Sequence, residues 1–80
     1  MRHEDIFAAV RRNVGEVMDD VDPAAVTLDR SLADLGCNSI DRAEVVTLTM
    51  ADLGITVPVM DFQDARDLRA LVALLARHAA

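Results

Sequence analysis

Eighty residues with a hydrophobic fraction of 52% form one small domain, residues 1–80, with no room for a second core. A chain of this length leaves little space for an enzyme pocket of ordinary size, about 300 Å³ or more, which argues against autonomous catalysis. The net charge of −6 excludes nucleic acid and anionic membranes as partners, because a negative field repels both.

The negative charge is concentrated in the middle of the chain. Residues 19–44 carry seven acidic side chains and two arginines, whereas residues 1–18 sum to zero. This acidic segment is expected to attract basic protein surfaces.

The sequence contains no signal for export or for a membrane. No apolar run is long enough to cross a membrane, and the N-terminal segment does not resemble a signal peptide. Cys37 is the single cysteine and cannot form an internal disulfide. We expect a cytoplasmic protein that is a monomer.

The first predicted helix covers residues 4–18, where apolar side chains recur at the spacing of one helix face. These side chains are Ile6, Phe7, Val10, Val14, Val17 and Met18. We place Arg11, Arg12 and Asn13 on the opposite, solvent-facing side. The aspartates and the proline of residues 19–23 end the helix.

A connection of about 20 residues follows, which is long for a loop inside a small domain. Five apolar side chains can hold it against the core: Val21, Val26, Leu28, Leu32 and Leu35. We expect residues 31–35 to form a single helical turn, and we expect Gly36 to let the chain turn sharply after it.

The second helix is predicted to begin at Asn38 or Ser39, both good N-cap residues, and to end at residue 52 or 53, before Gly54. One face carries the apolar residues Ile40, Ala43, Val46, Met50 and Leu53, and Val45 and Leu48 widen it. Residues 55–58 are expected to be extended, because the residue before Pro58 is restricted away from helix.

The remaining sequence predicts a short third helix at residues 60–64, with Phe62 pointing inward, and a last helix from residue 65 or 66 to His78. The last helix carries Leu68, Leu71, Val72, Leu74 and Leu75 on one side. The expected fold class is therefore all-α, a small four-helix bundle of three long helices and one short helix with a long first loop.

The chain lacks the residue patterns of an enzyme or of a metal site. His3 and His78 lie near opposite ends of the sequence, and neither is close in sequence to Cys37. The aspartates of residues 19–22 lack the glycine and the closing glutamate of a calcium loop. We assign no catalytic residue and no metal ligand.

Ser39 is the strongest candidate for a functional residue. Residues 34–41 read Asp-Leu-Gly-Cys-Asn-Ser-Ile-Asp, which places the serine hydroxyl at the start of a helix after a glycine turn. A phosphodiester on this hydroxyl would lie at the positive end of the helix dipole, among unpaired backbone N–H groups. A helix cap with no further function explains the same stretch, so local physics alone names no modification.

This stretch resembles the acyl carrier protein family, and the resemblance extends over nearly the whole chain. The family pattern of Leu, two residues, Leu-Gly, one residue and Asp-Ser-Leu is matched by residues 32–40, and its Ile-Pro step by residues 55–58. The resemblance implies an acyl-carrier-protein-like bundle that is not an enzyme. It also implies that a phosphopantetheinyl transferase attaches 4′-phosphopantetheine from coenzyme A to Ser39, and that acyl groups form thioesters with the arm's thiol.

Two departures from the family pattern predict a different choice of partner. Asn38 replaces the usual aspartate, and the second helix has fewer glutamates and carries Arg42 near its start. This variant resembles the freestanding donor carriers of polyketide β-branching cassettes, which deliver acetyl units to a 3-hydroxy-3-methylglutaryl-CoA (HMG-CoA)-synthase-like enzyme. That resemblance implies an acyltransferase or a ketosynthase-like decarboxylase as a further partner.

The surface expected to face the synthase consists of Ile40, Arg42, Ala43 and Met50. Ordinary core or solvated helix positions remain the alternative for these four residues. For the whole chain, the alternatives are a generic polyketide or fatty-acid carrier, a carrier domain of a larger synthase, and an unmodified helical adaptor in which Ser39 only caps a helix.

Overall fold

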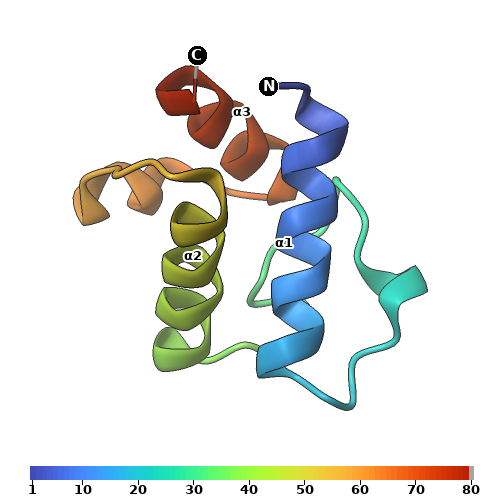
Figure 1. Ribbon diagram of the computed structural model, residues 1–80. Helices are drawn as coiled ribbons and strands as arrows, with labels where there is room; N and C mark the ends of the chain where they lie inside the picture. Colours follow the sequence, from blue (N-terminus) through green and yellow to red (C-terminus); the bar gives the residue numbers. More distant parts are fainter. Residues whose placement is uncertain (80) are drawn as a thin grey trace.

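The computed structural model describes residues 1–79 and contains three α-helices. They are α1 (His3–Val17), α2 (Ser39–Leu53) and α3 (Leu68–Ala79), with 3₁₀ helices η1 (Pro23–Ala25) and η2 (Val59–Asp64) between them. Helices α1 and α2 lie side by side and antiparallel, and α3 also packs against α1 (Figure 1). The described residues contain no strand, so the all-α fold class is confirmed. None of these helices is both long and apolar enough to cross a membrane.

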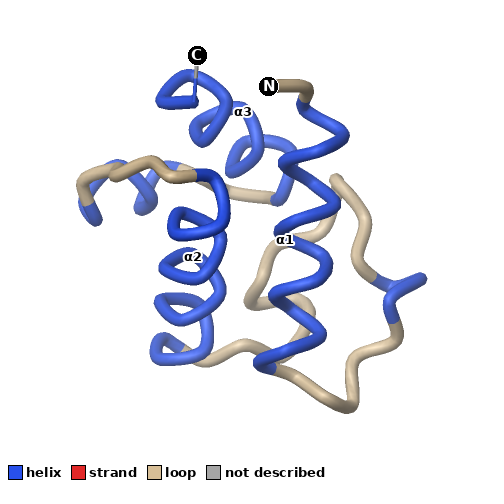
Figure 2. The backbone as a smooth tube through the Cα atoms, in the orientation of Figure 1, coloured by secondary structure: helices blue, strands red, loops and turns tan. Residues whose placement is uncertain are grey.

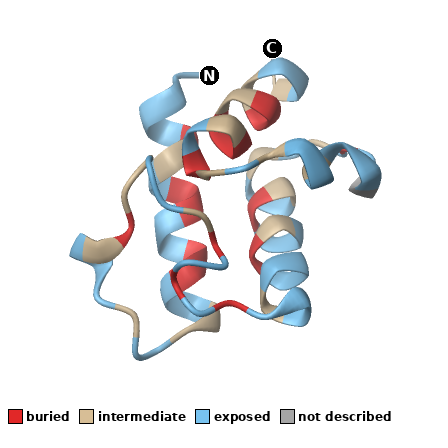
Figure 3. Ribbon diagram, turned by 180° about the vertical axis from the view of Figure 1, so that it is seen from behind, coloured by how far each residue is buried: buried red, intermediate tan, exposed pale blue. Residues whose placement is uncertain are grey.

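The core lies where the three helices meet, and α1 is central to it. Ile6, Val10 and Val14 of α1 are fully buried, as is Val45 of α2. Figure 3 shows buried positions of α2 on its side toward α1. Helix α3 adds the predicted apolar residues Leu68, Leu71, Val72, Leu74 and Leu75.

The long first loop is held against this core, as its apolar residues predicted. Val26, Leu32 and Leu35 are buried, and Val21 and Leu28 pack against the same cluster. Figure 2 shows how little of the loop is helical. The expected helical turn at residues 31–35 is a series of hydrogen-bonded turns over residues 32–36, not a helix.

Helix α2 begins and ends where the sequence predicted. Asn38 is its N-cap, and Gly54 ends it with a left-handed φ of 67°. The N–H of Ile55 donates to the carbonyl of Met50 at 3.1 Å, which closes the helix and directs the chain away from it. A side chain at residue 54 would strain this backbone conformation.

Two other elements differ from the prediction. The segment expected as a short α-helix at residues 60–64 is the 3₁₀ helix η2, and Phe62 is partly buried there against the core. Helix α3 begins at Leu68, later than the expected residue 65 or 66. The later start has a physical cause, because the Asp67 carboxylate accepts the N–H of Ala70 at 2.9 Å, as an N-cap does.

The first loop also fixes the start of α3. The N–H of Leu68 donates to the carbonyl of Arg30 at 2.8 Å, and the N–H of Arg69 donates to the carbonyl of Leu28 at 2.9 Å. Two N–H groups that a helix start leaves unpaired are thus satisfied by a segment distant in sequence. Helix α1 begins and ends one residue earlier than predicted, a difference of the size by which helix ends commonly vary.

The expectation that Asn13 faces solvent is wrong. Its side chain is only 5% exposed and donates to Thr49 Oγ1 at 3.0 Å and to Asp52 Oδ2 at 2.9 Å. Thr49 is itself fully buried and donates to the carbonyl of Val45 at 2.7 Å. A polar side chain is buried at this position of α1 because α2 offers it acceptors.

Candidate functional site

Ser39 is the first residue of α2, directly after a reciprocal cap. Asn38 Oδ1 accepts the N–H of Asp41 at 2.8 Å, and Asp41 Oδ2 accepts the N–H of Asn38 at 3.2 Å. Before the cap, Gly36 has a φ of 94°, which produces the predicted sharp turn. The glycine turn and the cap together fix the backbone of Ser39, while its side chain is left exposed.

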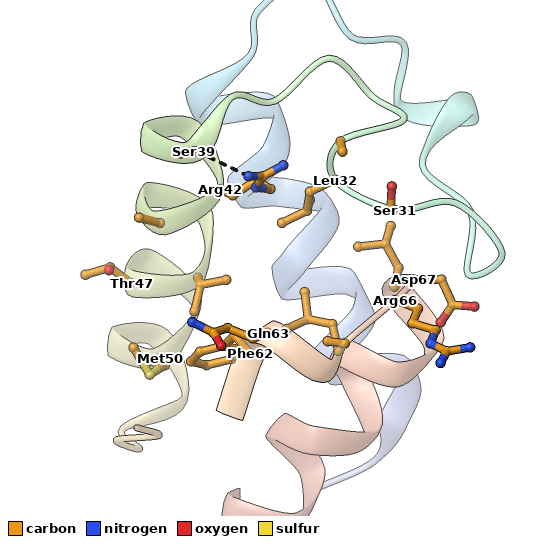
Figure 4. Close-up of a pocket in the computed structure, with 16 residues that line it drawn as sticks. Ser31, Leu32, Ser39, Arg42, Thr47, Met50, Phe62, Gln63, Arg66 and Asp67 are labelled. Carbon is orange, nitrogen blue, oxygen red and sulfur yellow. Dashed lines mark hydrogen bonds between the residues drawn. The ribbon is translucent and has the colours of Figure 1, made fainter. Parts of the chain in front are cut away.

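The hydroxyl of Ser39 accepts a hydrogen bond from a positively charged side chain one turn further along α2. Arg42 Nη2 donates to Ser39 Oγ at 3.2 Å, a contact that Figure 4 marks with a dashed line. Both side chains are exposed, so the hydroxyl can be reached from solution. Residues three apart are neighbours on a helix surface, so the spacing allows this contact but does not by itself fix the direction of the Arg42 side chain.

The thiol of Cys37 lies close to this site in sequence but is chemically separate from it. Its side chain is 5% exposed. Burial raises the pKa of the Cys37 thiol above its ordinary value, and the nearby Asp41 carboxylate raises this pKa further, while the Arg42 guanidinium opposes both effects. The thiol therefore stays protonated at neutral pH and is a poor nucleophile.

A groove of about 610 Å³ begins at Ser39 and runs between α2, the first loop, η2 and the start of α3, which is more space than the length of the chain led us to expect. Its α2 side is lined by Arg42 and Met50 among others, and its η2 side by Phe62 and Gln63 (Figure 4). Arg66 and Asp67 line the opposite end from Ser39. The exposed surface of the groove as a whole is mostly apolar, so this groove, called the α2–η2 groove below, can receive an apolar chain tethered at the hydroxyl.

The four residues expected to face a partner occupy two environments. Ile40, Arg42 and Ala43 are exposed, and Ile40 is 75% exposed, although it belongs to the apolar face predicted for α2. Met50 is partly buried, and its sulfur accepts the N–H of Val57 at 3.3 Å. The buried residues that hold α2 against α1 are Val45 and Thr49. This buried face is shifted by one residue along the sequence from the apolar face that was predicted.

Sequence reasoning missed two polar residues of the groove, Gln63 and Arg66, because the segment between α2 and α3 shows no periodicity that would orient them. His78, one of the candidates set aside, has its Nε2 atom 3.9 Å from the carboxylate of Asp61. Within residues 1–79, no three His, Cys, Asp or Glu side chains are grouped as metal ligands would be.

Comparisons with known proteins agree with this geometry. A family model described as a phosphopantetheine attachment site matches residues 8–75. The chain is 28% identical over 75 residues to the polyketide biosynthesis acyl-carrier-protein AcpK of Bacillus subtilis (strain 168), an alignment that covers 94% of this chain and 92% of the relative. It is 35% identical over 68 residues to the acyl carrier protein of Treponema pallidum (strain Nichols), covering 80% of this chain and 86% of the relative.

Proposed function

The chain belongs to the acyl carrier protein family, whose members carry acyl groups on phosphopantetheine and are not themselves enzymes, and we propose that Ser39 is its attachment residue. We further propose that the arm carries an acetyl thioester, which the protein delivers to an HMG-CoA-synthase-like enzyme in polyketide β-branching. The exposed hydroxyl at the start of α2, beside Arg42, is the observation that carries the first proposal. Family members act with a phosphopantetheinyl transferase and with biosynthetic enzymes.

The residues around Ser39 fit a phosphodiester. The first turn of a helix leaves backbone N–H groups without an intrahelical acceptor, and Ser39 lies in the first turn of α2. The Arg42 guanidinium adds a positive charge next to the hydroxyl oxygen. Asn38 caps the helix with a neutral side chain, so at this position there is no charge that would repel the phosphate.

Attachment would be a group transfer from coenzyme A. Ser39 Oγ forms the bond to the phosphorus that carries pantetheine, the phosphoanhydride bond of coenzyme A breaks, and adenosine 3′,5′-bisphosphate leaves. The hydroxyl proton passes to a base, which we assign to the transferase, because Arg42 is a donor and cannot accept a proton. The arm's thiol then takes the acyl group from an acyl thioester donor, whose C–S bond breaks and whose thiol leaves with the proton.

Intact-mass measurement tests the attachment residue. The chain is incubated with coenzyme A and a promiscuous phosphopantetheinyl transferase, and we expect a single added arm that Ser39→Ala abolishes. Ser31→Ala is the matched control, because Ser31 is the other serine of the chain and lines the same groove. An arm retained in Ser39→Ala would assign attachment elsewhere, and a bare wild type across several transferases would favour the unmodified adaptor.

Two observations support the donor role. The surface next to Ser39 is apolar and cationic at Ile40, Arg42 and Ala43, in a chain whose net charge is −6. A partner with a purely basic docking patch would gain little from this surface, which favours a specialised partner. The second observation is the similarity to a polyketide biosynthesis carrier. Met50 would contribute from the groove, where it is partly buried.

Acetyl transfer to the synthase tests this role. We expect an HMG-CoA-synthase-like enzyme to accept acetyl from this carrier in preference to a standard acetylated carrier. Ile40→Ala should slow the transfer about fivefold or more, as the loss of an apolar anchor worth about 1 kcal/mol would. Leu48→Ala is the control, because Leu48 is also an exposed apolar residue of α2 but lies about two turns further from Ser39 than Ile40 does. Equal transfer from both carriers would favour a generic polyketide or fatty-acid carrier.

A further inference from the structure

Arg42 differs from the other arginines of α1 and α2 in what it contacts. Arg12 pairs with Asp52 at 2.8 Å, and Arg11 lies over the Phe7 ring and donates to a backbone carbonyl. Arg42 forms no ion pair within residues 1–79, and its one hydrogen bond there goes to Ser39 Oγ. A guanidinium has five N–H donors, so most of those of Arg42 have no acceptor in the described part of the protein.

The nearest acidic side chain in sequence forms no ion pair with this guanidinium within residues 1–79. Asp41 precedes Arg42 directly, but its carboxylate accepts the N–H of Asn38 in the helix cap. Asn38 itself is neutral. The positive charge next to Ser39 Oγ is therefore available to an anion bound at that oxygen.

We propose that Arg42 binds the phosphodiester of the arm and thereby orients the arm on α2. The inference rests on the proposed attachment at Ser39 and deepens it. Arg42 Nη2 already contacts the oxygen that becomes the ester oxygen, so the non-bridging oxygens of the phosphodiester form within reach of the same planar donor group. Guanidinium groups bind phosphate with paired hydrogen bonds, which an ammonium group cannot reproduce.

The contact has a consequence for the direction of the arm. Arg42 and Ser39 both line the α2–η2 groove, at the same end of it. Holding the phosphodiester on Arg42 restricts the first bonds of the arm to this side of α2. Because both side chains are exposed, the interaction is screened by salt, and its effect should weaken as ionic strength rises.

Nuclear magnetic resonance of the holo protein tests the proposal, after intact mass has shown that the arm is present. We expect the side-chain N–H signals of Arg42 to shift when apo protein becomes holo protein. Those of Arg66 should stay unchanged, because Arg66 is an exposed arginine at the opposite end of the same groove. Raising the salt to about 1 M, where exposed charges are screened beyond about 3 Å, should reduce the shift.

The phosphorus resonance of the arm supplies a second measurement that a purely structural role would not change. It should move in Arg42→Gln, move part of the way in Arg42→Lys and stay in place in Arg66→Gln. An arm on Ser39 with unchanged Arg42 signals and the same phosphorus resonance in Arg42→Gln would overturn this proposal alone. A wild-type protein that takes no arm would overturn the attachment proposal and this one with it.

Discussion

Helix α2 has two sides with different neighbours. Toward α1 it is closed, because Val45 packs in the core and Thr49 joins Asn13 in a buried hydrogen bond. Toward η2 and the start of α3 it faces the α2–η2 groove, which partly buried side chains such as Met50 and Phe62 line. The side toward α1 is thus held by a buried hydrogen bond between polar side chains. The side toward η2 is held by apolar contacts next to an open groove.

The difference assigns separate tasks to the two sides. A buried donor satisfied by acceptors on a second helix fixes the rotation and the axial position of that helix, because few other registers would satisfy it. The groove side lacks such a constraint, so its side chains can adjust. Helix α2 can thus hold Ser39 on a fixed support, and under the proposed attachment the space beside it would accommodate the arm or its cargo. Substitutions on the closed side should accordingly cost more stability than substitutions on the groove side.

The largest loss is expected for Asn13→Ala. This change leaves Thr49 Oγ1 without a donor in a buried site and removes a hydrogen bond to Asp52. A buried polar group left without its partner costs about 1–3 kcal/mol, and the lost volume adds to this, so the free energy of unfolding should fall by about 2–3 kcal/mol. Urea unfolding followed by circular dichroism measures it.

Gln63→Ala is the control for this substitution, because Gln63 is an exposed polar side chain on the groove side. Its free energy of unfolding should stay within about 0.5 kcal/mol of the wild type. Equal losses in the two variants would show that the hydrogen bonds of Asn13 do not distinguish the closed side.

A smaller loss is expected for Met50→Ala. Met50 is partly buried, so truncation removes only part of the apolar contact of a core methionine, together with the contact between its sulfur and the N–H of Val57. We expect a loss of about 1–1.5 kcal/mol in the same urea experiment. Met50→Leu conserves volume and should cost less than about 1 kcal/mol. A loss for Met50→Ala as large as that for Asn13→Ala would mean that the groove side is as rigid as the closed side.

The features of α2 that could be predicted from the sequence are those with local causes. Asn38 and Gly54 act on backbone groups within a few residues, so the start and end of the helix could be predicted from the sequence. The exposure of Ser39 follows from its place in the first turn. The hydrogen bond from Arg42 is local as well, but the direction in which a long side chain points is not set by spacing alone.

The features that could not be predicted depend on segments distant in sequence. Asn13 and Thr49 are 36 residues apart, and each is polar within its own helix. Burial of these two side chains is favourable only because they form a hydrogen bond with each other. The spacing of apolar residues within a single helix does not show which residue of another helix will be the partner. The start of α3 depends in the same way on the carbonyls of Leu28 and Arg30 in the first loop.

The smallest effect is expected at the exposed edge of the closed side, at Asp52. Hydrogen bonds from Asn13 and from Arg12 keep the pKa of the Asp52 carboxyl below its ordinary value. Because the folded-state pKa is the lower one, ionised Asp52 stabilises the folded protein at pH values above the unfolded-state pKa of about 4. This contribution is lost as the pH falls through the folded-state pKa.

Comparison of the thermal midpoints of wild type and Asp52→Asn over pH measures this contribution. The two midpoints should differ by a constant amount at pH values well above the unfolded-state pKa and should converge as the pH falls through the folded-state pKa of Asp52. Asp20→Asn is the control, because Asp20 is exposed and makes no hydrogen bond within residues 1–79. A difference that persists at the lowest pH would mean that the effect comes from the amide group that replaces the carboxyl and not from the loss of the charge.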